Sequence, residues 1–504
     1  MNKKQKKVRI LTYVYLMPLF AIMAFNTALS FVQTTYMETG MDNEIPLYKA
    51  DAWWFVLLGA LLFLGLLYYA QKKTDFLSRQ HKKVHYCCLG ISCLLCIAVL
   101  VVFKATASCD SATVIDLAVS LKNGDYSAYT GDGYLVHYPH QIGFIKLLQL
   151  VFRVFGDKNY LVCQIGNLIC ILGIEELLIR ISYLLFQRER VMSTTAILCA
   201  CCAPLFMYVT FIYGDIPGLA LGLLGLYLTL LYLQKGKWVM FLAIGVAMGA
   251  SLICKSNNLV LLIGVAGILV LKVLEEKDWQ NLVGVALVVI LAIGISKIPS
   301  AMIMKEAGLT KYPAGNPKLS WIAMGLQEND YLEDGWYNSY NWNVYANHNY
   351  DSSEANKACV ESIKDSLRTY VTEPRRGLRF FYNKFRSQWN DPGFQSQITN
   401  EWYSRHQNHY SDIYNWVVFG KGKLVLEWIM NIYQFMILLG SSVAVFKLIG
   451  KKEWSLSRGL LPLCIFGGFL FHMFWEAQGR YALPYFILMI PLAGFGLTKI
   501  LQKK

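Results

Sequence analysis

The sequence predicts an all-α protein that crosses a membrane about twelve times. Of its 504 residues, 55% are hydrophobic and only 16% are charged, and the apolar residues are gathered into runs. These runs repeatedly approach the roughly 20 residues that an α-helix needs to cross about 30 Å of hydrocarbon. The basic residues lie mainly in short clusters between the runs, as the positive-inside rule predicts for a multi-pass protein. Composition, run length and charge placement therefore indicate the same fold class.

Twelve apolar segments are the expected transmembrane helices. The first is followed by many more segments and by no small-residue cleavage site, so we interpret it as a retained helix and not as a removed signal peptide. The twelve segments are residues 10–31, 52–70, 85–103, 160–186, 193–213, 216–233, 237–254, 257–273, 281–303, 423–447, 459–476 and 481–499.

The loops between these segments determine the expected orientation. Basic residues concentrate before the first segment, after the second, fourth, sixth and tenth, and at the C-terminus, where they are Lys499, Lys503 and Lys504. All of these clusters fall inside if both termini are cytoplasmic. The net charge of +14 then reflects membrane topology, which argues against nucleic acid as a partner. We expect a plasma-membrane protein in contact with lipids, with its long loops facing outward.

Residues Ile142–Phe155 are an apolar stretch that tests this topology. They number only 14 and include Lys146 and Arg153, and a crossing here would place most later basic loops outside. We therefore interpret them as an amphipathic helix in the membrane interface. Its cations would reach toward headgroups, and its Leu, Ile and Phe side chains would be buried.

Two outer segments are long enough to carry a function. Residues 104–159 contain several acids and two histidines, and residues 304–422 are rich in Trp, Tyr and Asn. The second segment suits a small extracytoplasmic cap of mixed secondary structure. The chain then divides into an N-terminal helix pair at 1–84, a core at 85–303 that includes the first outer segment, the cap, and C-terminal helices at 423–504.

Within the cap, Pro374–Trp389 has the pattern of a basic amphipathic helix. Such a helix could rest on lipid headgroups or guide a phosphate group. The aromatic residues of the cap could stack on sugar rings, pack the cap itself or form an interfacial belt.

Several outer motifs occur in an order that resembles a known superfamily of enzymes. An acid lies in the first large outer loop (CDSATVIDLAVSLKNGDYSAY) and is followed by YPHQIGFIKLLQLVFRVFG. An Asp then heads a span (YGDIPGLALG), and CKSNN and WEAQGRYALPYF come later. Over roughly residues 85–499, this order and topology resemble the GT-C glycosyltransferases. The closest resemblance is to the family 39-like members, which include protein O-mannosyltransferases and the aminoarabinose transferases of lipid A. The first two spans look like an addition to that pattern.

The resemblance implies transfer of a sugar from a polyprenyl-phosphate donor to an extracytoplasmic acceptor, usually with inversion at the anomeric carbon. The acceptor could be a cell-envelope glycan, a glycolipid or a protein. An acceptor hydroxyl is a poor nucleophile, so a carboxylate must take its proton as the new bond forms. Asp110 matches the family's acid and is the expected base, unless it caps the helix that follows. Asp116, six residues on, is expected to be structural or to help position the acceptor.

The leaving group would be a lipid phosphate, and its developing charge requires cations near the interface. Arg480 matches the family's late outer motif, and its planar guanidinium can hold two phosphate oxygens. It could also form a salt bridge to Glu476, four residues earlier, which is itself a candidate for positioning the acceptor. Lys255 is a second phosphate candidate unless it snorkels to headgroups. Tyr481 either hydrogen-bonds the phosphate or lies in the aromatic belt.

The sequence also departs from the family pattern. The aminoarabinose transferases carry Lys-Pro-Pro in the first loop where this chain has YPHQ at 138–141, which argues against a lipid A acceptor. His140 could donate a hydrogen bond to the phosphate in place of that lysine. Gln141 is a candidate for positioning the acceptor. Asp215, at the head of a later span, either positions the acceptor or caps its helix.

No metal or other cofactor is predicted, although a divalent metal is left open. The acids and histidines of the first loop could approach one another, but the chain has neither an HExxH-type spacing nor a DxD pair. A disulfide between Cys109 and Cys359, both in outer loops, is also open because nothing in the sequence fixes their geometry.

Two other functional classes fit a polytopic protein. A transporter or flippase should show related halves and broken mid-membrane spans, and we see no such repeat. A non-catalytic scaffold of envelope polysaccharide assembly would keep the architecture without needing a base. Replacing Asp110 with Asn separates these classes, because only the enzyme depends on the carboxylate.

Overall fold

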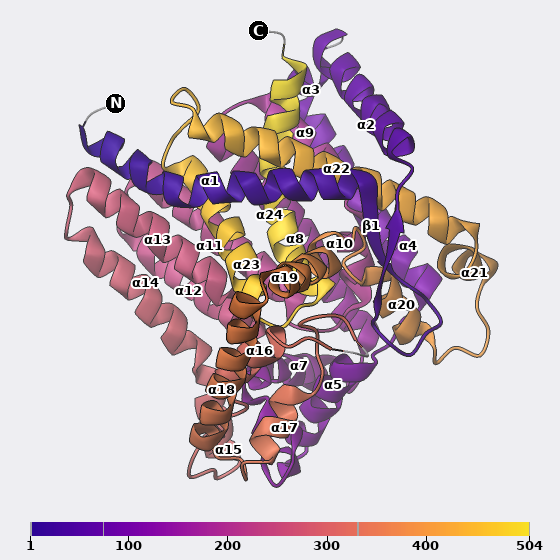
Figure 1. The fold of residues 1–504 in the computed structure, drawn as a ribbon, viewed down its shortest axis with the longest axis vertical. Coiled ribbons are helices and arrows are strands. Elements are labelled where there is room, and N and C mark those ends of the chain that lie inside the picture. Colours follow the sequence, from indigo (N-terminus) through magenta and orange to yellow (C-terminus); the bar gives the residue numbers. More distant parts are fainter. Residues whose placement is uncertain (1–2, 74, 330–331, 503–504) are drawn as a thin grey trace.

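Helices make up nearly all of the regular structure in the computed structural model, which describes residues 3–73, 75–329 and 332–502 (Figure 1). The predicted all-α fold is confirmed. Long runs of Leu, Ile, Val and Ala favour helices here because, in lipid, every backbone N–H and C=O must be bonded within the segment.

Helical segments correspond to all twelve expected spans. Among the described residues, nine helices are long and apolar enough to cross a membrane, or ten if α9 and α10, which meet at 50°, form one bent span. Two further helices, α8 and the 16-residue α12, correspond to the remaining two expected spans. The helices are α1 (Lys3–Val32), α2 (Trp53–Tyr68), α4 (His81–Phe103), α8 (Tyr160–Phe186), α9 (Glu189–Ala200), α10 (Ala203–Met207), α11 (Asp215–Lys235), α12 (Val239–Cys254), α13 (Leu259–Glu276), α14 (Asn281–Ser296), α22 (Lys421–Ile449), α23 (Leu460–Phe474) and α24 (Gly479–Leu501).

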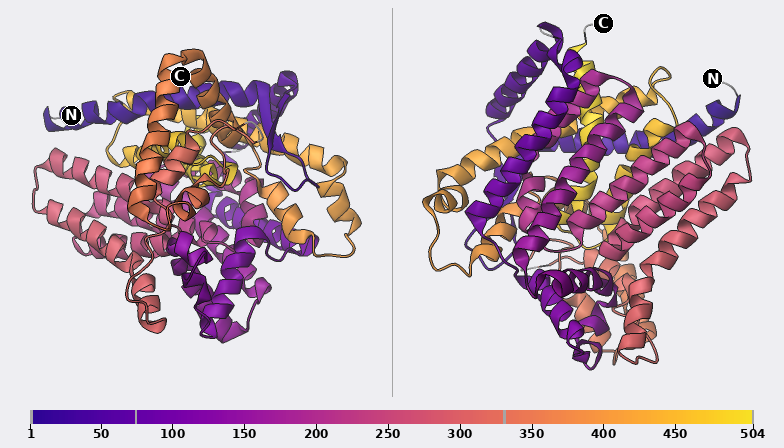
Figure 2. Two further views of the ribbon diagram at one scale, coloured as in Figure 1. Left: turned by 60° about the horizontal axis from the view of Figure 1, so that its bottom comes forward. Right: turned by 180° about the vertical axis from the view of Figure 1, so that it is seen from behind.

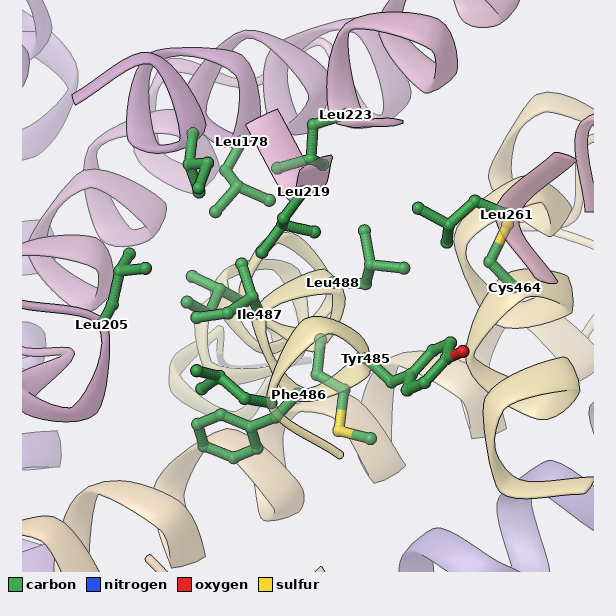
Figure 3. Packing of buried hydrophobic residues seen from close by; sticks show 14 of the residues in the cluster. Leu178, Leu205, Leu219, Leu223, Leu261, Cys464, Tyr485, Phe486, Ile487 and Leu488 are labelled. Carbon is green, nitrogen blue, oxygen red and sulfur yellow. The ribbon is translucent and has the colours of Figure 1, made fainter. Parts of the chain in front are cut away.

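Helix α24 runs through the middle of the bundle. Its residues Tyr485, Phe486, Ile487 and Leu488 lie among apolar side chains of α8, α10, α11, α13 and α23 (Figure 3). On another side, a Cβ atom at Gly496 would lie 1.7 Å from the backbone oxygen of α22 at Gly440, so these two backbones touch. This packing fixes the position of both ends of α24.

Basic residues that the sequence predicts to lie on the same side of the membrane are found together at one end of the bundle. Glu453 pairs with Lys499 at 2.6 Å and with Arg458 at 2.9 Å, and lies 3.7 Å from Arg188. We call this end the basic end. Lys503 and Lys504 lie outside the described residues.

The first outer segment forms helices at the opposite end. α5 (Cys109–Lys122) packs against α7 (Ile142–Phe155), and Figure 2 shows them across the ends of the longer helices. α7 is the expected amphipathic helix, with Leu148 and Phe152 buried and Leu150 and Val154 exposed. Lys146, however, forms an ion pair with Glu306 instead of reaching toward headgroups.

The cap differs from the expected mixture of helices and strands. Its described residues form only helices: α15 (Ile298–Glu306), α16 (Lys318–Gly325), α17 (Tyr340–Ala346), α18 (Ser352–Thr372), α19 (Pro374–Trp389), α20 (Ser396–Ser404) and α21 (Asp412–Val418). The strand pair of this structure lies between α1 and α2 instead. There β1 (Gln33–Met37) and β2 (Pro46–Ala50) pair antiparallel, with Gln33 opposite Ala50.

This N-terminal hairpin is held firmly against the cap and α22. The backbone N–H of Thr35 donates to the oxygen of Asn390 at 3.1 Å, and the side chain of Asn390 donates to the oxygen of Gln33 at 2.7 Å. On β2, Lys49 pairs with Glu427 of α22 at 2.7 Å. The two helices that look like an addition in the sequence are therefore packed into the rest of the molecule.

Candidate active site

Segments far apart in the sequence bring ionisable side chains together at the end opposite the basic end. They come from the start of α5, the turn before α7, the start of α11, the turn after α12 and the chain around the start of α24. Electrostatic interactions link these groups to one another. We call them the polar cluster, which comprises Asp110, His140, Asp215, Lys255, Glu476, Arg480 and Tyr481.

Asp110 offers an unengaged carboxylate. It lies in the first turn of α5 with an exposed side chain, and the N-cap position belongs to Ser108. Within the described residues, its side chain has no hydrogen bond or ion pair, so the capping alternative has no bond to support it. The next residue, Ser111, anchors the helix by donating to the backbone oxygen of Ile212 at 2.7 Å. A carboxylate held this way is able to accept a proton from a ligand hydroxyl.

Two glycines bring Asp215 against Lys255. A Cβ atom at Gly214 would lie 1.8 Å from the backbone oxygen of Cys254, so α11 begins in direct contact with the end of α12. A Cβ atom at Gly218 would lie 3.1 Å from that of Lys255. Across this junction, the Nζ of Lys255 lies 2.9 Å from a carboxylate oxygen of Asp215.

Lys255 is an inward-facing cation. Its side chain is 16% exposed, and its Nζ lies 4.7 Å from the ring centre of Tyr213 and 5.5 Å from that of Tyr481. Burial lowers the pKa of Lys255, while the charge of Asp215 acts in the opposite direction. The side chain therefore bonds within the protein and does not snorkel to headgroups.

Arg480 has a guanidinium group surrounded by aromatic rings. Its Cζ lies 5.5 Å from the ring centre of Phe211, 6.0 Å from that of Tyr213 and 5.3 Å from that of Tyr481. Its buried Nε has no hydrogen-bond partner in the described part of the chain. The expected salt bridge to Glu476 is not among the ion pairs of the described residues, because α23 ends at Phe474 and the two residues do not share a helix. The charge is thus available to an anionic ligand.

Glu476 is a buried acid beside this arginine. Only 5% of its surface is exposed, and burial raises its pKa to about 7, although the charge of Arg480 opposes the rise. Near neutral pH, the side chain therefore exists in both protonated and ionised forms. It can either donate to or accept from a ligand oxygen.

The turn before α7 places His140 and Gln141 at the same end. His140 is exposed, with its ring 6.2 Å from that of Tyr138 and 6.3 Å from that of Trp321 in the cap. The side chain of Gln141 donates to the hydroxyl of Tyr213. Gln141 therefore supports a ring that lines Lys255 and Arg480, which fits a positioning role.

Two other polar residues of the first outer segment are engaged elsewhere. Asp116 pairs with Lys158 at 2.7 Å on the surface, and both side chains are about half exposed. His137 is fully buried between Asp132 at 2.6 Å and Asn316 at 2.8 Å, and so connects this segment to the cap. In the described parts of the chain, no three His, Cys, Asp or Glu residues are placed to hold a metal ion. Cys109 and Cys359 are free thiols.

Glu44, in the loop between β1 and β2, is a residue near the cluster that the sequence does not reveal. Its carboxylate accepts from the side chain of Gln478 at 2.9 Å, and its charge interacts with those of Arg480 and Asp110. Burial raises the pKa of Glu44. No local pattern identifies this acid, because its placement depends on packing between the hairpin and the turn before α24.

The cap positions Arg480 directly. The backbone N–H of Arg480 donates to the side chain of Gln395 at 3.0 Å. Asp391 shapes the turn before α20 by accepting from the backbone N–H groups of Gly393 and Gln395, each at 2.8 Å. At Gly479, a Cβ atom would lie 3.1 Å from the Asp391 carboxylate, so this turn lies against the start of α24. The Pro-Gly pair in the turn is visible in the sequence, but its contact with α24 is not.

Helix α19 matches the basic helix expected at Pro374–Trp389, but some of its cations face inward. Lys384 is buried and donates to the backbone oxygens of Gly325 and Trp475, the latter at 2.7 Å. Arg376 pairs with a glutamate of the cap at 2.6 Å. Lys384 thus holds the turn before α24 to the cap, while Arg376 forms its ion pair within the cap.

Comparison with known families gives one match, to the central helices. Residues 140–297 match the family described as dolichyl-phosphate-mannose-protein mannosyltransferase. The matched stretch includes Asp215 and Lys255, whereas Asp110 and Arg480 lie outside it. A search of curated proteins finds no match to this chain. The predicted resemblance to the GT-C glycosyltransferases is thus confirmed for this part of the chain, and the apolar helices are those of an integral membrane protein.

Proposed function

We propose that the protein transfers a sugar from a polyprenyl-phosphate donor to a hydroxyl group of an extracytoplasmic acceptor, with inversion at the anomeric carbon. One observation carries the proposal: the Asp110 carboxylate, which has no hydrogen bond or ion pair among the described residues, lies within electrostatic reach of Arg480, whose buried Nε has no partner there. A base and an anion-binding cation at one end of a transmembrane bundle suit a substrate whose phosphate lies at the membrane surface. The matched family is named for a lipid-phosphate sugar, which supports the donor class.

The geometry suggests a single displacement. The acceptor hydroxyl gives its proton to Asp110 while its oxygen bonds to the anomeric carbon. The bond from that carbon to the phosphate oxygen breaks, and the lipid phosphate leaves with the electron pair. Arg480 binds the phosphate, and Lys255 adds positive charge, so the leaving group is stabilised as its charge develops. Attack on the face opposite the leaving group inverts the configuration.

The remaining members of the cluster have supporting roles in this proposal. Asp215 holds Lys255, and Gln141 holds the ring of Tyr213 beside both cations. Tyr481 and exposed His140 are further candidates to donate to the phosphate. Protonated Glu476 would avoid repelling that phosphate and could position the acceptor through a hydrogen bond.

The proposal also assigns the two ends of the bundle to two compartments. The basic end and both termini would be cytoplasmic, and the polar cluster would be extracytoplasmic, because basic residues favour the inner side. The basic end and the polar cluster lie at opposite ends of α24, which supports this assignment. A cell-envelope glycan, a glycolipid or a protein would then supply the acceptor hydroxyl.

The decisive experiment is a transfer assay in lipid nanodiscs with a panel of polyprenyl-phosphate sugars. We expect Asp110→Asn to lower the rate of sugar transfer or release by about a hundredfold or more, because a general base contributes roughly 10²–10⁴ in rate. Asp116→Asn is the matched control, since that acid lies on the same helix but pairs with a surface lysine. Equal rates for the native and Asp110→Asn proteins would refute the assignment of the base.

One observation favours a second candidate, a lipid flippase. The 50° bend between α9 and α10 is the kind of broken span that transporters use. A flippase would move a labelled polyprenyl-phosphate sugar across a vesicle membrane without losing the sugar, and Asp110→Asn would not affect it. The same panel of donors, followed for sidedness as well as sugar release, separates the two functions.

A further inference from the structure

The basic end contains a compact group of cations around a single carboxylate. Arg188 follows α8, Arg458 precedes α23 and Lys499 lies in the last turn of α24, yet all three surround Glu453. Most of this charge is withdrawn from water: the side chains of Glu453, Arg458 and Lys499 are 15%, 18% and 17% exposed. We call these four residues the basic-end cluster.

The cluster is held rigidly by its surroundings. The Nε of Arg458 donates to the backbone oxygen of Leu185 at 2.8 Å, and its Nη1 donates to that of Glu453 at 2.6 Å. The rings of Phe186 and Phe495 stack with centres 4.1 Å apart, and all three cations lie within about 6 Å of the Phe495 ring centre. The charges are therefore fixed in place by α8 and α24.

The charges of this cluster do not balance. Three cations and one carboxylate leave a surplus of two positive charges. The ends of α8 and α24 point here, and each helix C-terminus carries only about half a negative charge. Positive charge of about one unit therefore remains uncompensated in a poorly solvated site, where a bare charge is costly.

One cation of the cluster also has unused bonding capacity. Arg188 lies 3.7 Å from Glu453, the longest of the three contacts, and 37% of its side chain is exposed. Its Nη1 atom is buried and has no partner among the described residues. Lys499, Arg188 and Arg458 hold the pKa of Glu453 below its ordinary value, against the effect of burial, so protonating the acid would only increase the imbalance.

We propose that the basic-end cluster binds a phosphate group, through Arg188 and its neighbouring cations, at the membrane boundary. A phosphate carries the missing negative charge, and its oxygens accept the charge-assisted hydrogen bonds that arginine offers. The cluster lies where transmembrane helices end, so the headgroup of an anionic phospholipid is the expected source. This site is at the opposite end of α24 from the polar cluster and does not depend on the proposed reaction.

Binding is tested by thermal unfolding of the whole protein in nanodiscs of neutral phosphatidylcholine, with and without phosphatidylglycerol. We expect phosphatidylglycerol to raise the melting temperature of the native protein and that of Arg188→Lys, which keeps the charge. In Arg188→Gln the rise should largely disappear. Native mass spectrometry should show bound phosphatidylglycerol weakened about fivefold, the effect of roughly one basic residue near a membrane surface.

The control is Lys235→Gln, which removes an exposed cation in the last turn of α11 that has no ion-pair partner among the described residues. It should respond to phosphatidylglycerol like the native protein. Inorganic phosphate, titrated in neutral nanodiscs, distinguishes a soluble ligand from a headgroup. If it stabilises the native protein but not Arg188→Gln, the phosphate site stands and its source is soluble. Equal responses of the native protein, Arg188→Gln and Lys235→Gln would overturn the proposal.

Discussion

Glu476 illustrates how a single residue can be placed for chemistry at a cost in stability. Its side chain is 5% exposed, and its pKa of about 7 lies above the ordinary value of 4.5. Between these two values the folded protein binds more protons than the unfolded chain. The folded state is therefore destabilised as pH rises through this range. Catalytic sites often contain residues of this kind, whose environment matches their pKa to the working pH.

We predict that Glu476→Gln stabilises the protein at pH 8, because the amide removes the penalty of ionising a buried acid. At pH 4.5 and below, the carboxyl is protonated in the fold and the advantage should vanish. Melting temperatures of both proteins across this range check the prediction. A constant difference at every pH would show that Glu476 does not titrate with a raised pKa.

The sequence identifies each residue of the polar cluster individually but not the contacts that hold the cluster together. Arg480 and Glu476 are four residues apart, which suggests an ion pair on one helix. The break between α23 and α24 places only Arg480 on a helix, so this pair does not form. Glu44 and Gln395 escape notice because each reaches the cluster through contacts with residues distant in the chain. Local patterns carry no information on such contacts.

At the scale of elements, the junction of α11 and α12 is the most demanding part of the site. The backbones meet at Gly214, where any side chain would collide with a backbone oxygen that cannot rotate away. The junction fixes the Asp215–Lys255 pair, so a small change in packing is expected to have a large effect on the polar cluster.

We predict that Gly214→Ala lowers both the melting temperature and the sugar-transfer rate, because its Cβ would lie 1.8 Å from the oxygen of Cys254. Gly294→Ala in α14 is the matched control, since a Cβ there would have no neighbour within 4 Å, and it should unfold like the native protein. Circular dichroism melts in detergent measure the first effect and the nanodisc assay the second. A Gly214→Ala protein with native behaviour would contradict the close contact.

The helices are the elements that the sequence predicts best. Each span is marked by its own run of apolar residues, and α7 by its short length and two cations, so no distant partner is needed to recognise them. The cap is different. Its aromatic-rich segments become helices that are stabilised by the hairpin and by the turn before α24, and such long-range packing is not encoded in local hydropathy.

For the whole molecule, the central prediction is its orientation. We expect Cys109, an exposed thiol beside Asp110, to react with a membrane-impermeant maleimide in intact cells. A cysteine introduced by Lys235→Cys, near the opposite end of the bundle, should react only after the cells are permeabilised. Each site is labelled in its own variant: one keeps Cys109 and the other carries Lys235→Cys. In both variants, the other exposed cysteines are replaced. The reverse pattern would place the polar cluster in the cytoplasm.

The N-terminal hairpin changes how the molecule divides. The sequence suggests that residues 1–84 are separable, but Lys49 bonds to α22 and Glu44 adjoins the polar cluster. The expected domain boundaries therefore describe the order of segments along the chain, while the active end is built from both sides of the first boundary.

Helix α24 connects the two charged ends of the protein as one continuous element. Arg480 and Lys499 are 19 residues apart, so about 29 Å of helix separates them, close to the thickness of a bilayer's hydrocarbon core. A membrane of different thickness cannot keep both cations at its two surfaces unless the helix tilts or the lipids deform. Bilayer thickness would thus set the depth at which the polar cluster meets a lipid-borne phosphate. Lipid chain length would then alter the position of the polar cluster through a single helix.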